Sequence, residues 1–138
     1  MCRPVVTTPK MSAKLRKLGI NGVTTADMMW IYCNTKHPYL MELSRNPKER
    51  MLDLTRRFDV LPAWSERSLM DMLPTMINGA ELAIRPLMVD GRKVWEVSYF
   101  MFHAEMADDL FDALIAMMAV CVRNNKIEPK YLSNDNGK

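Results

Sequence analysis

The strongest constraint on the fold is a tight turn at Asp90-Gly91, because it determines how the two flanking segments pair. A two-residue Asp-Gly loop is typical of a type I′ turn, in which both central residues have positive φ. Counting outward from this turn places Ile84 opposite Val97 and Arg85 opposite Glu96. Side chains alternate between the two faces of a strand. The register therefore predicts one apolar face and one polar face that carries a cross-strand ion pair.

Pro86 limits how the predicted hairpin can extend. In this register the backbone nitrogen of Pro86 points away from the partner strand, and proline has no amide hydrogen to donate on that side. The first strand is therefore predicted to be an edge, and any further strand is predicted to join beside residues 94–101. The candidate third strand is residues 39–43, which read Tyr-Leu-Met-Glu-Leu.

A long helix over about residues 104–123 is predicted to cover the hairpin. A two-stranded ribbon is marginally stable alone, so its apolar face needs a cover. Acidic residues fill the first turns of this segment and Arg123 lies near its end, as the helix dipole favours. At helical spacing the apolar residues form a single arc. They are Met106, Ala107, Leu110, Phe111, Leu114, Met117, Met118, Cys121 and Val122.

The N-terminal half predicts three or four short helices. One runs from about residue 25 to 33, capped by Thr24, with Asp27 in a capping box. A second starts at Asn46, which precedes a proline at the first helical position. A third follows Ser65 and ends before Pro74. The predicted fold class is α+β: a β-hairpin over residues 81–101, with 39–43 as the candidate third strand, covered by the C-terminal helix and preceded by the short helices.

Length and composition predict one domain. The 138 residues suffice to bury an independent core. We expect a flexible extension over residues 1–10, with Met11 as an alternative start, then a single domain over 11–126 and a frayed tail over 127–138. No apolar run reaches about 18 residues, which excludes a membrane-spanning helix. Three widely spaced cysteines predict reduced thiols in a cytoplasm rather than a disulfide framework.

Methionine content and charge distribution carry the functional information. Methionine supplies 14 of 138 residues. It fills irregular cores, and it is also over-used on surfaces that adapt to partners. Up to and including Arg67 there are 12 basic and 6 acidic residues, whereas beyond it there are 7 basic and 10 acidic. The excess of positive charge in the first half would suit a negatively charged partner.

Two patterns resemble metal sites without meeting their requirements. Asp108-Asp109-Leu110-Phe111-Asp112 has the spacing of the aspartate-rich motif by which prenyl-transferring enzymes hold magnesium diphosphate. The large helical bundle and second metal motif of those enzymes are absent. Cys33 and His37 are four residues apart and His103 and Cys121 lie elsewhere in the chain, but a site built from these four lacks the further close-spaced ligand pair of a structural zinc site.

Catalysis is not predicted either. A nucleophilic Cys-His pair has no local signature in this sequence, and the glycines are too scattered to form a phosphate-binding loop. We therefore expect no catalytic residue, no metal and no cofactor.

The basic first half defines an alternative function, the binding of nucleic acid. Its residues could face phosphates while Trp30 or Tyr32 stacks on a base. Acidic residues interleave with the bases, and no recognition helix is evident. The predicted contact residues are Arg45, Lys48, Arg50, Arg56, Arg57 and Arg67, and Lys14, Arg16 and Lys17 could belong to the same phosphate-facing surface.

Three sequence landmarks carry a resemblance to a known group. They are Thr25-Ala26-Asp27-Met28, then Leu61-Pro62-Ala63-Trp64-Ser65 with Met72-Leu73-Pro74, and finally Trp95-Glu96-Val97-Ser98-Tyr99. In order and spacing, residues 11–126 resemble small uncharacterised proteins carried by phages and mobile elements of Bacteroidetes. That group has no established activity, so the resemblance implies only a setting, the cytoplasm of an infected or element-bearing bacterium.

These observations favour a small non-enzymatic binding protein, phage- or element-encoded, that acts through protein–protein contacts. Its methionine- and aromatic-rich faces are the residue types enriched in protein interfaces. Self-association as a homodimer is the expected corollary, since twofold dimers are the commonest assemblies. The alternative is a nucleic-acid-binding regulator that uses the basic half.

Overall fold

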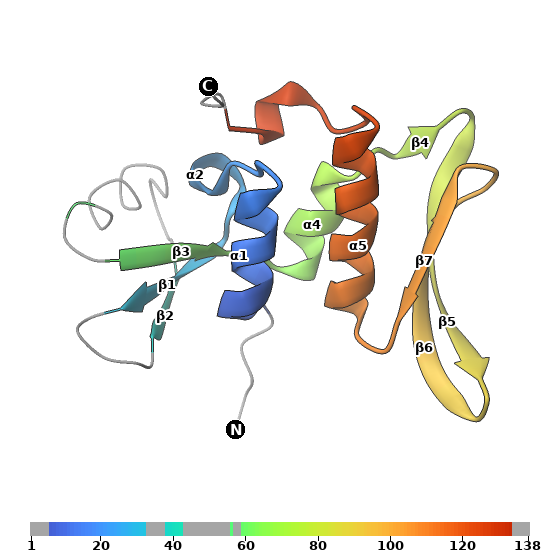
Figure 1. The fold of residues 1–138 in the computed structure, drawn as a ribbon, viewed down its shortest axis with the longest axis horizontal. Helices are drawn as coiled ribbons and strands as arrows, with labels where there is room; N and C mark the ends of the chain where they lie inside the picture. The colour runs from blue at the N-terminus through green and yellow to red at the C-terminus, as the bar shows by residue number, and fades with distance from the viewer. Residues whose placement is uncertain (1–5, 33–37, 43–55, 57–58, 134–138) are drawn as a thin grey trace. The chain divides into compact units, whose positions relative to one another are not determined.

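The computed structural model of the chain describes residues 6–32, 38–42, 56 and 59–133. The fold is α+β, as predicted, with antiparallel strands in two sheets (Figure 1). The chain divides into two compact units: residues 1–68 with 130–138 form unit 1, and residues 69–129 form unit 2. Each unit contains one of the two sheets, and each sheet buries its own apolar residues.

Unit 1 begins with helix α1 (Pro9–Lys17), which starts inside the predicted flexible extension. Thr8 caps this helix by accepting a hydrogen bond from the Met11 backbone N–H, and Pro9 occupies the first turn, where its missing N–H costs nothing. The preceding residue, Thr7, is buried and hydrogen-bonds Ser12 on α1. Residues 6–10 therefore belong to the folded unit.

The sheet of unit 1 has the order β2-β1-β3, formed by β1 (Met28–Tyr32), β2 (Tyr39–Glu42) and β3 (Asp59–Ala63). The prediction of a helix over residues 25–33 is wrong, because the helix at this point, α2 (Gly22–Thr25), ends at Thr25 and residues 28–32 form β1. Met29 and Ile31 are buried at alternate positions and pack with Met41 and Val60. Residues 28–32 pair with β2 on one side and with β3 on the other, and this pairing outweighed the helix-capping signal of Thr24 and Asp27.

The predicted strand at 39–43 exists as β2, but its predicted partner is wrong. β2 pairs with β1 and not with the hairpin of unit 2. The predicted helix starting at Asn46 lies outside the described residues, apart from Arg56, which is helical.

Helix α4 (Glu66–Met72) confirms the predicted helix after Ser65. The Ser65 hydroxyl accepts a hydrogen bond from the Ser68 N–H, the pattern of an N-cap. Asp27, predicted to close a capping box on its own helix, instead accepts from the Ser65 N–H at 2.8 Å and the Ser68 hydroxyl at 2.6 Å. The helix ends two residues before Pro74, as predicted.

Residues 130–133 return to unit 1, within the segment predicted to be a frayed tail. The short 3-10 helix η1 (Pro129–Tyr131) leads into a β-bridge between Ile20 and Leu132. The Asn21 N–H donates to the Tyr131 carbonyl at 2.8 Å, and the Ser133 N–H donates to the Gly19 carbonyl at 2.7 Å. These backbone bonds hold the segment in place.

Unit 2 is built on the predicted hairpin, β5 (Ala80–Val89) and β6 (Arg92–Tyr99), and the predicted register is confirmed. Asp90 and Gly91 both have positive φ, as a type I′ turn requires. Ile84 pairs with Val97, and Arg85 pairs with Glu96. The Arg85 Nε lies 2.7 Å from the Glu96 Oε1, so the predicted cross-strand ion pair is present.

The third strand beside β6 is β7 (His103–Ala107), where the sequence predicted the start of the long helix. Helix α5 is correspondingly shorter and spans Leu110–Arg123. Asp109 has extended backbone angles and its carboxylate accepts from the Phe111 N–H, so it is the N-cap of α5. Because the N-cap residue has non-helical backbone angles, the helix cannot extend to the residues before Asp109.

The sheet of unit 2 has the order β4-β5-β6-β7. β4 (Met76–Ile77) pairs only with Glu81 and Ala80, at the start of β5. Beyond that point β5 is an edge, as Pro86 predicts. Helix α5 lies along one face of this sheet (Figure 1). In the described residues, no helix is long and apolar enough to cross a membrane.

Candidate functional site

The two faces of the unit 2 sheet differ in what covers them. Val97 and Tyr99, which share a face by alternation, are both buried. The Tyr99 hydroxyl donates to the Pro74 carbonyl at 2.6 Å. Burial raises the pKa of Tyr99, and the nearby Cys121 thiol of α5 raises it further. We call this the covered face, because α5 packs on it.

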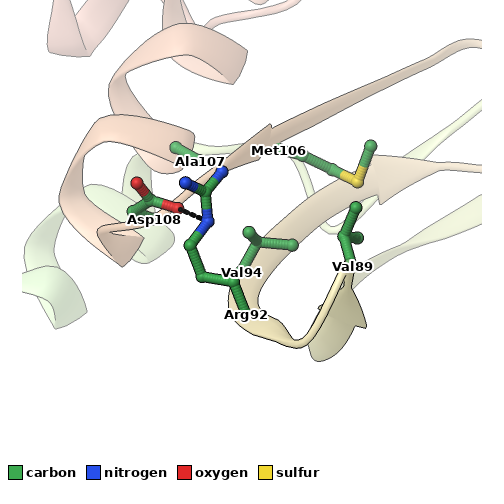
Figure 2. A pocket seen from close by; sticks show the side chains of 6 residues that line it. All are labelled: Val89, Arg92, Val94, Met106, Ala107 and Asp108. Carbon is green, nitrogen blue, oxygen red and sulfur yellow. Dashed lines mark ion pairs between the residues drawn. The ribbon is translucent and has the colours of Figure 1, made fainter.

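The opposite face, the open face, carries the Arg85–Glu96 ion pair and a hollow. No described element of unit 2 lies over this face (Figure 1). The hollow measures about 300 Å³ and lies near the β5–β6 turn, where β7 ends. Figure 2 shows its lining side chains. They are Val89, Arg92, Val94, Met106, Ala107 and Asp108.

The hollow has an apolar floor and a charged rim. Val94 is buried, whereas Met106 keeps 57% of its surface exposed. On the rim, the Arg92 Nε lies 3.2 Å from the Asp108 Oδ1 (Figure 2). The two side chains are 70% and 65% exposed, so water screens this pair and it contributes little to stability. Both charges are therefore free to turn toward a bound group.

A second exposed feature is the turn between β6 and β7, which we call the Phe100–Met101 turn. The Phe102 N–H donates to the Tyr99 carbonyl at 3.0 Å and closes it. Phe100 is 78% exposed and Met101 is 86% exposed. Met101 also has φ of 66°, a left-handed conformation that costs free energy for any residue with a Cβ. Large apolar side chains on a strained, exposed turn favour a contact role over a role in the core.

The predicted metal-like aspartates have other partners. Asp109 caps α5, Asp108 pairs with Arg92, and Asp112 is exposed on the first turn of the helix. Among the residues that the structure describes, no group of three or more His, Cys, Asp or Glu could hold a metal ion.

The cysteine and histidine candidates are not brought together in the described part of the chain. Cys33 and His37 lie outside that part. On β7, the His103 Nε2 and the Glu105 Oε2 lie within hydrogen-bonding distance of each other. Cys121 is buried in α5, and its burial raises the pKa of the thiol to about 11, an effect that Lys126 opposes. The thiol is therefore protonated at neutral pH and is not the thiolate that acts as a nucleophile.

Most of the predicted nucleic-acid contact residues lie outside the part of the chain that the structure describes. Arg45, Lys48, Arg50 and Arg57 lie outside the described residues, whereas Arg56 and Arg67 are both exposed. The clearer basic surface is on α1, which contains no acidic residue. Lys10, Lys14 and Lys17 recur there at the spacing of one helix face and are exposed. Sequence reasoning missed Lys10, because residues 1–10 were assigned to an extension.

The hollow was also missed from the sequence, although part of its signal was present. The hairpin register already placed Val89, Arg92 and Val94 on one face. Met106, which pairs with Glu96 on that face, was assigned to the helix together with Ala107, so neither residue was placed beside the hairpin. The overlooked signal is Asp109, a good N-cap residue directly before the apolar helix, which marks residues 103–107 as a separate element.

Comparison of the sequence with models of known protein families, with curated proteins and with solved structures finds no match.

Proposed function

We propose that the protein is a small non-enzymatic binding protein that acts through protein–protein contacts made by unit 2. The observation that carries this proposal is the Phe100–Met101 turn. Its side chains are large, apolar and exposed, and the backbone of Met101 has a left-handed conformation. Aromatic residues and methionine are enriched in protein interfaces, where a few anchors dominate affinity.

The hollow on the open face supports the same proposal. Its apolar floor and its loosely paired Arg92 and Asp108 suit one apolar side chain with a polar group beside it. A hollow of about 300 Å³ is at the low end for small-molecule pockets, and the one carboxylate in its lining, Asp108, pairs with Arg92. The bacterial phage or mobile-element setting implied by the resemblance is part of the proposal and rests on that resemblance.

The test is capture of partners on immobilised protein, with Met101→Gly as the informative variant. Glycine adopts a φ of 66° without strain, so this change removes the anchor and leaves the turn intact. We expect partner affinity to fall about 30-fold, as loss of an interface anchor of roughly 2 kcal/mol predicts. Met88→Ser is the matched control, because Met88 is also exposed but lies at the other end of the hairpin. Equal capture by wild type and Met101→Gly refutes the proposal.

A second candidate, a nucleic-acid-binding regulator, is favoured by the lysine face of α1. If that face contacts phosphates, affinity for DNA should fall steeply with salt, because each neutralised phosphate releases counterions. Replacing Lys10, Lys14 and Lys17 together by glutamine should then weaken binding to unrelated sequences alike. Fluorescence anisotropy with generic DNA measures both effects. Salt-sensitive micromolar binding that this variant loses would replace the protein-contact proposal.

A further inference from the structure

Among the described strands of unit 2, β7 lies at the edge of the sheet and has a partner strand on one side only. It is the last strand in the order β4-β5-β6-β7. The opposite side of the sheet is less suitable, because β4 occupies the start of β5 and Pro86 has no N–H to donate. Within unit 2, a new strand can therefore join most readily beside β7.

The pairing pattern identifies which residues of β7 point their backbone groups outward. The two-residue turn makes Val89 and Arg92 a hydrogen-bonded pair, and such pairs alternate along an antiparallel ladder. The backbone groups of every second residue of β6, counted from Arg92, therefore bond to β5. The backbone groups of the residues between them point to the other side and bond to β7. The partners on β7 of these intervening residues are His103, Glu105 and Ala107. The backbone N–H and C=O groups of Ala104 and Met106 therefore point away from β6, toward the open side of β7. In the described part of the chain, no hydrogen bond outside the sheet reaches either residue.

This edge lacks the proline, lysine and bulge by which many proteins block an exposed strand. Its one carboxylate, Glu105, contacts His103 of the same strand. β7 reads His-Ala-Glu-Met-Ala, and its register with β6 runs without interruption. The residues that carry its outward backbone groups are the small Ala104 and the flexible, exposed Met106, neither of which blocks an approaching strand.

We propose that β7 pairs antiparallel with β7 of a second copy of this chain, around a twofold axis at Ala104. Ala104 then exchanges two backbone hydrogen bonds with Ala104 of the second copy. Glu105 lies opposite His103 of the second copy, and Met106 lies opposite Phe102. The result is one continuous sheet across a closed, isologous dimer.

Charge selects this register over its nearest alternatives. Residues whose backbone groups point outward must pair with each other, so the axis must lie at a residue of β7, and the central choices are Ala104, Glu105 and Met106. An axis at Met106 would place Glu105 opposite Ala107 and Asp108 opposite Ala104, so neither carboxylate would gain a partner. An axis at Glu105 would place two Glu105 carboxylates directly opposite each other, which is destabilising. The axis at Ala104 instead places each Glu105 opposite a histidine, the residue type with which it already pairs inside its own chain.

The same register accounts for both exposed features of unit 2. Continuing the count places Met101 of the second copy opposite Ala107, which lines the hollow together with Met106 and Asp108. The Phe100–Met101 turn of each copy then lies beside the hollow of the other. This inference rests on the proposed function, because it names a second copy as a partner for that turn.

Sedimentation velocity of the full chain from about 1 to about 500 µM provides the first test. We expect a monomer–dimer equilibrium for the wild type. Ala104→Pro removes the outward N–H on both copies at the axis and should raise the dimer Kd at least about tenfold. Ala104→Ser keeps the N–H and should behave as the wild type. A wild type that stays monomeric throughout this range overturns the inference, as does an Ala104→Pro variant that dimerises normally.

Disulfide trapping tests the register and does not depend on the proline variant folding. In a chain with Cys2→Ser and Cys33→Ser, Ala104→Cys should cross-link rapidly, because Cα atoms of such a pair lie about 5.5 Å apart, within disulfide range. Ala83→Cys, exposed on β5, is the control and should not cross-link. Equal cross-linking at both positions overturns the inference. If dimerisation fails while Met101→Gly still loses its captured partner, the proposed function stands and only this inference falls.

Discussion

Replacing Gly22 by alanine should destabilise unit 1, although alanine is the better helix former. Gly22 begins α2 and does not have a positive φ, so its backbone does not require glycine. A Cβ at this position would lie 2.3 Å from the Pro62 Cγ and 2.5 Å from the Pro62 Cβ. Pro62 is a buried ring on β3 and has no rotamer that moves these atoms away.

The magnitude follows from two opposing effects. Alanine in place of glycine in a helix is worth roughly 0.5–1 kcal/mol. Carbon atoms pack at about 3.5–4.0 Å, so the contact with Pro62 must open by more than about 1 Å through movement of α2 or β3. Overpacking of this kind costs about 1–3 kcal/mol. The clash outweighs the helix gain, and we expect a net loss of about 1–2 kcal/mol in the free energy of unfolding.

Urea unfolding followed by tryptophan fluorescence measures this loss, since Trp64 lies 3.5 Å from the new Cβ. Thr24→Ala is the matched control, because it adds alanine to the same short helix at an exposed position and should change stability by less than about 0.5 kcal/mol. In the double variant with Pro62→Gly, the penalty of Gly22→Ala should disappear. A Gly22→Ala protein as stable as the wild type, or more stable, would refute the packing of α2 against β3.

Other substitutions test unit 2 and the polar contacts of unit 1. Leu114→Ala should cost about 2–5 kcal/mol in urea unfolding, because Leu114 is fully buried on α5; a loss below about 1 kcal/mol would show that α5 does not pack as described. Asp27→Ala should cost about 1–3 kcal/mol by leaving the Ser65 N–H and the Ser68 hydroxyl without their acceptor, and Asp27→Asn should recover part of that loss. Burial raises the pKa of Cys121 from its ordinary value of 9.0 to about 11, so above pH 9 the unfolded chain binds fewer protons than the folded protein. Stability should therefore fall between about pH 9 and 11, and urea unfolding over this range should show a shallower fall for Cys121→Ala than for the wild type.

Local chemistry alone determined the hairpin. Asp90-Gly91 allows one turn type, and strand alternation then assigns every cross-strand pair, including Arg85 with Glu96. Pro86 limited pairing along β5 for the equally local reason that it lacks an N–H. The helix after Ser65 and its end before Pro74 were predictable on the same basis. The α+β class followed from these elements.

Where a segment's sequence suits both a helix and a strand, tertiary contacts decided which of the two forms. Residues 28–32 carried a helix-start signal upstream, but they became the central strand of a sheet because β2 and β3 satisfy their backbone on both sides. Residues 103–107 continued the apolar pattern of the helix. They form a strand because their backbone groups pair with β6, and α5 begins only after its N-cap residue, Asp109. The candidate site depended on this second choice, because Met106 and Ala107 complete the hollow only as part of a strand.

The sequence by itself therefore determined the turn, the register and the two faces of the hairpin, because these depend on residues adjacent along the chain or directly opposed across it. The division into two units, the partner of β2 and the free edge at β7 were decided only by the tertiary structure. Those outcomes depend on which distant segment satisfies a strand's hydrogen bonds. Backbone groups are the same in every strand, so the sequence does not specify that choice locally.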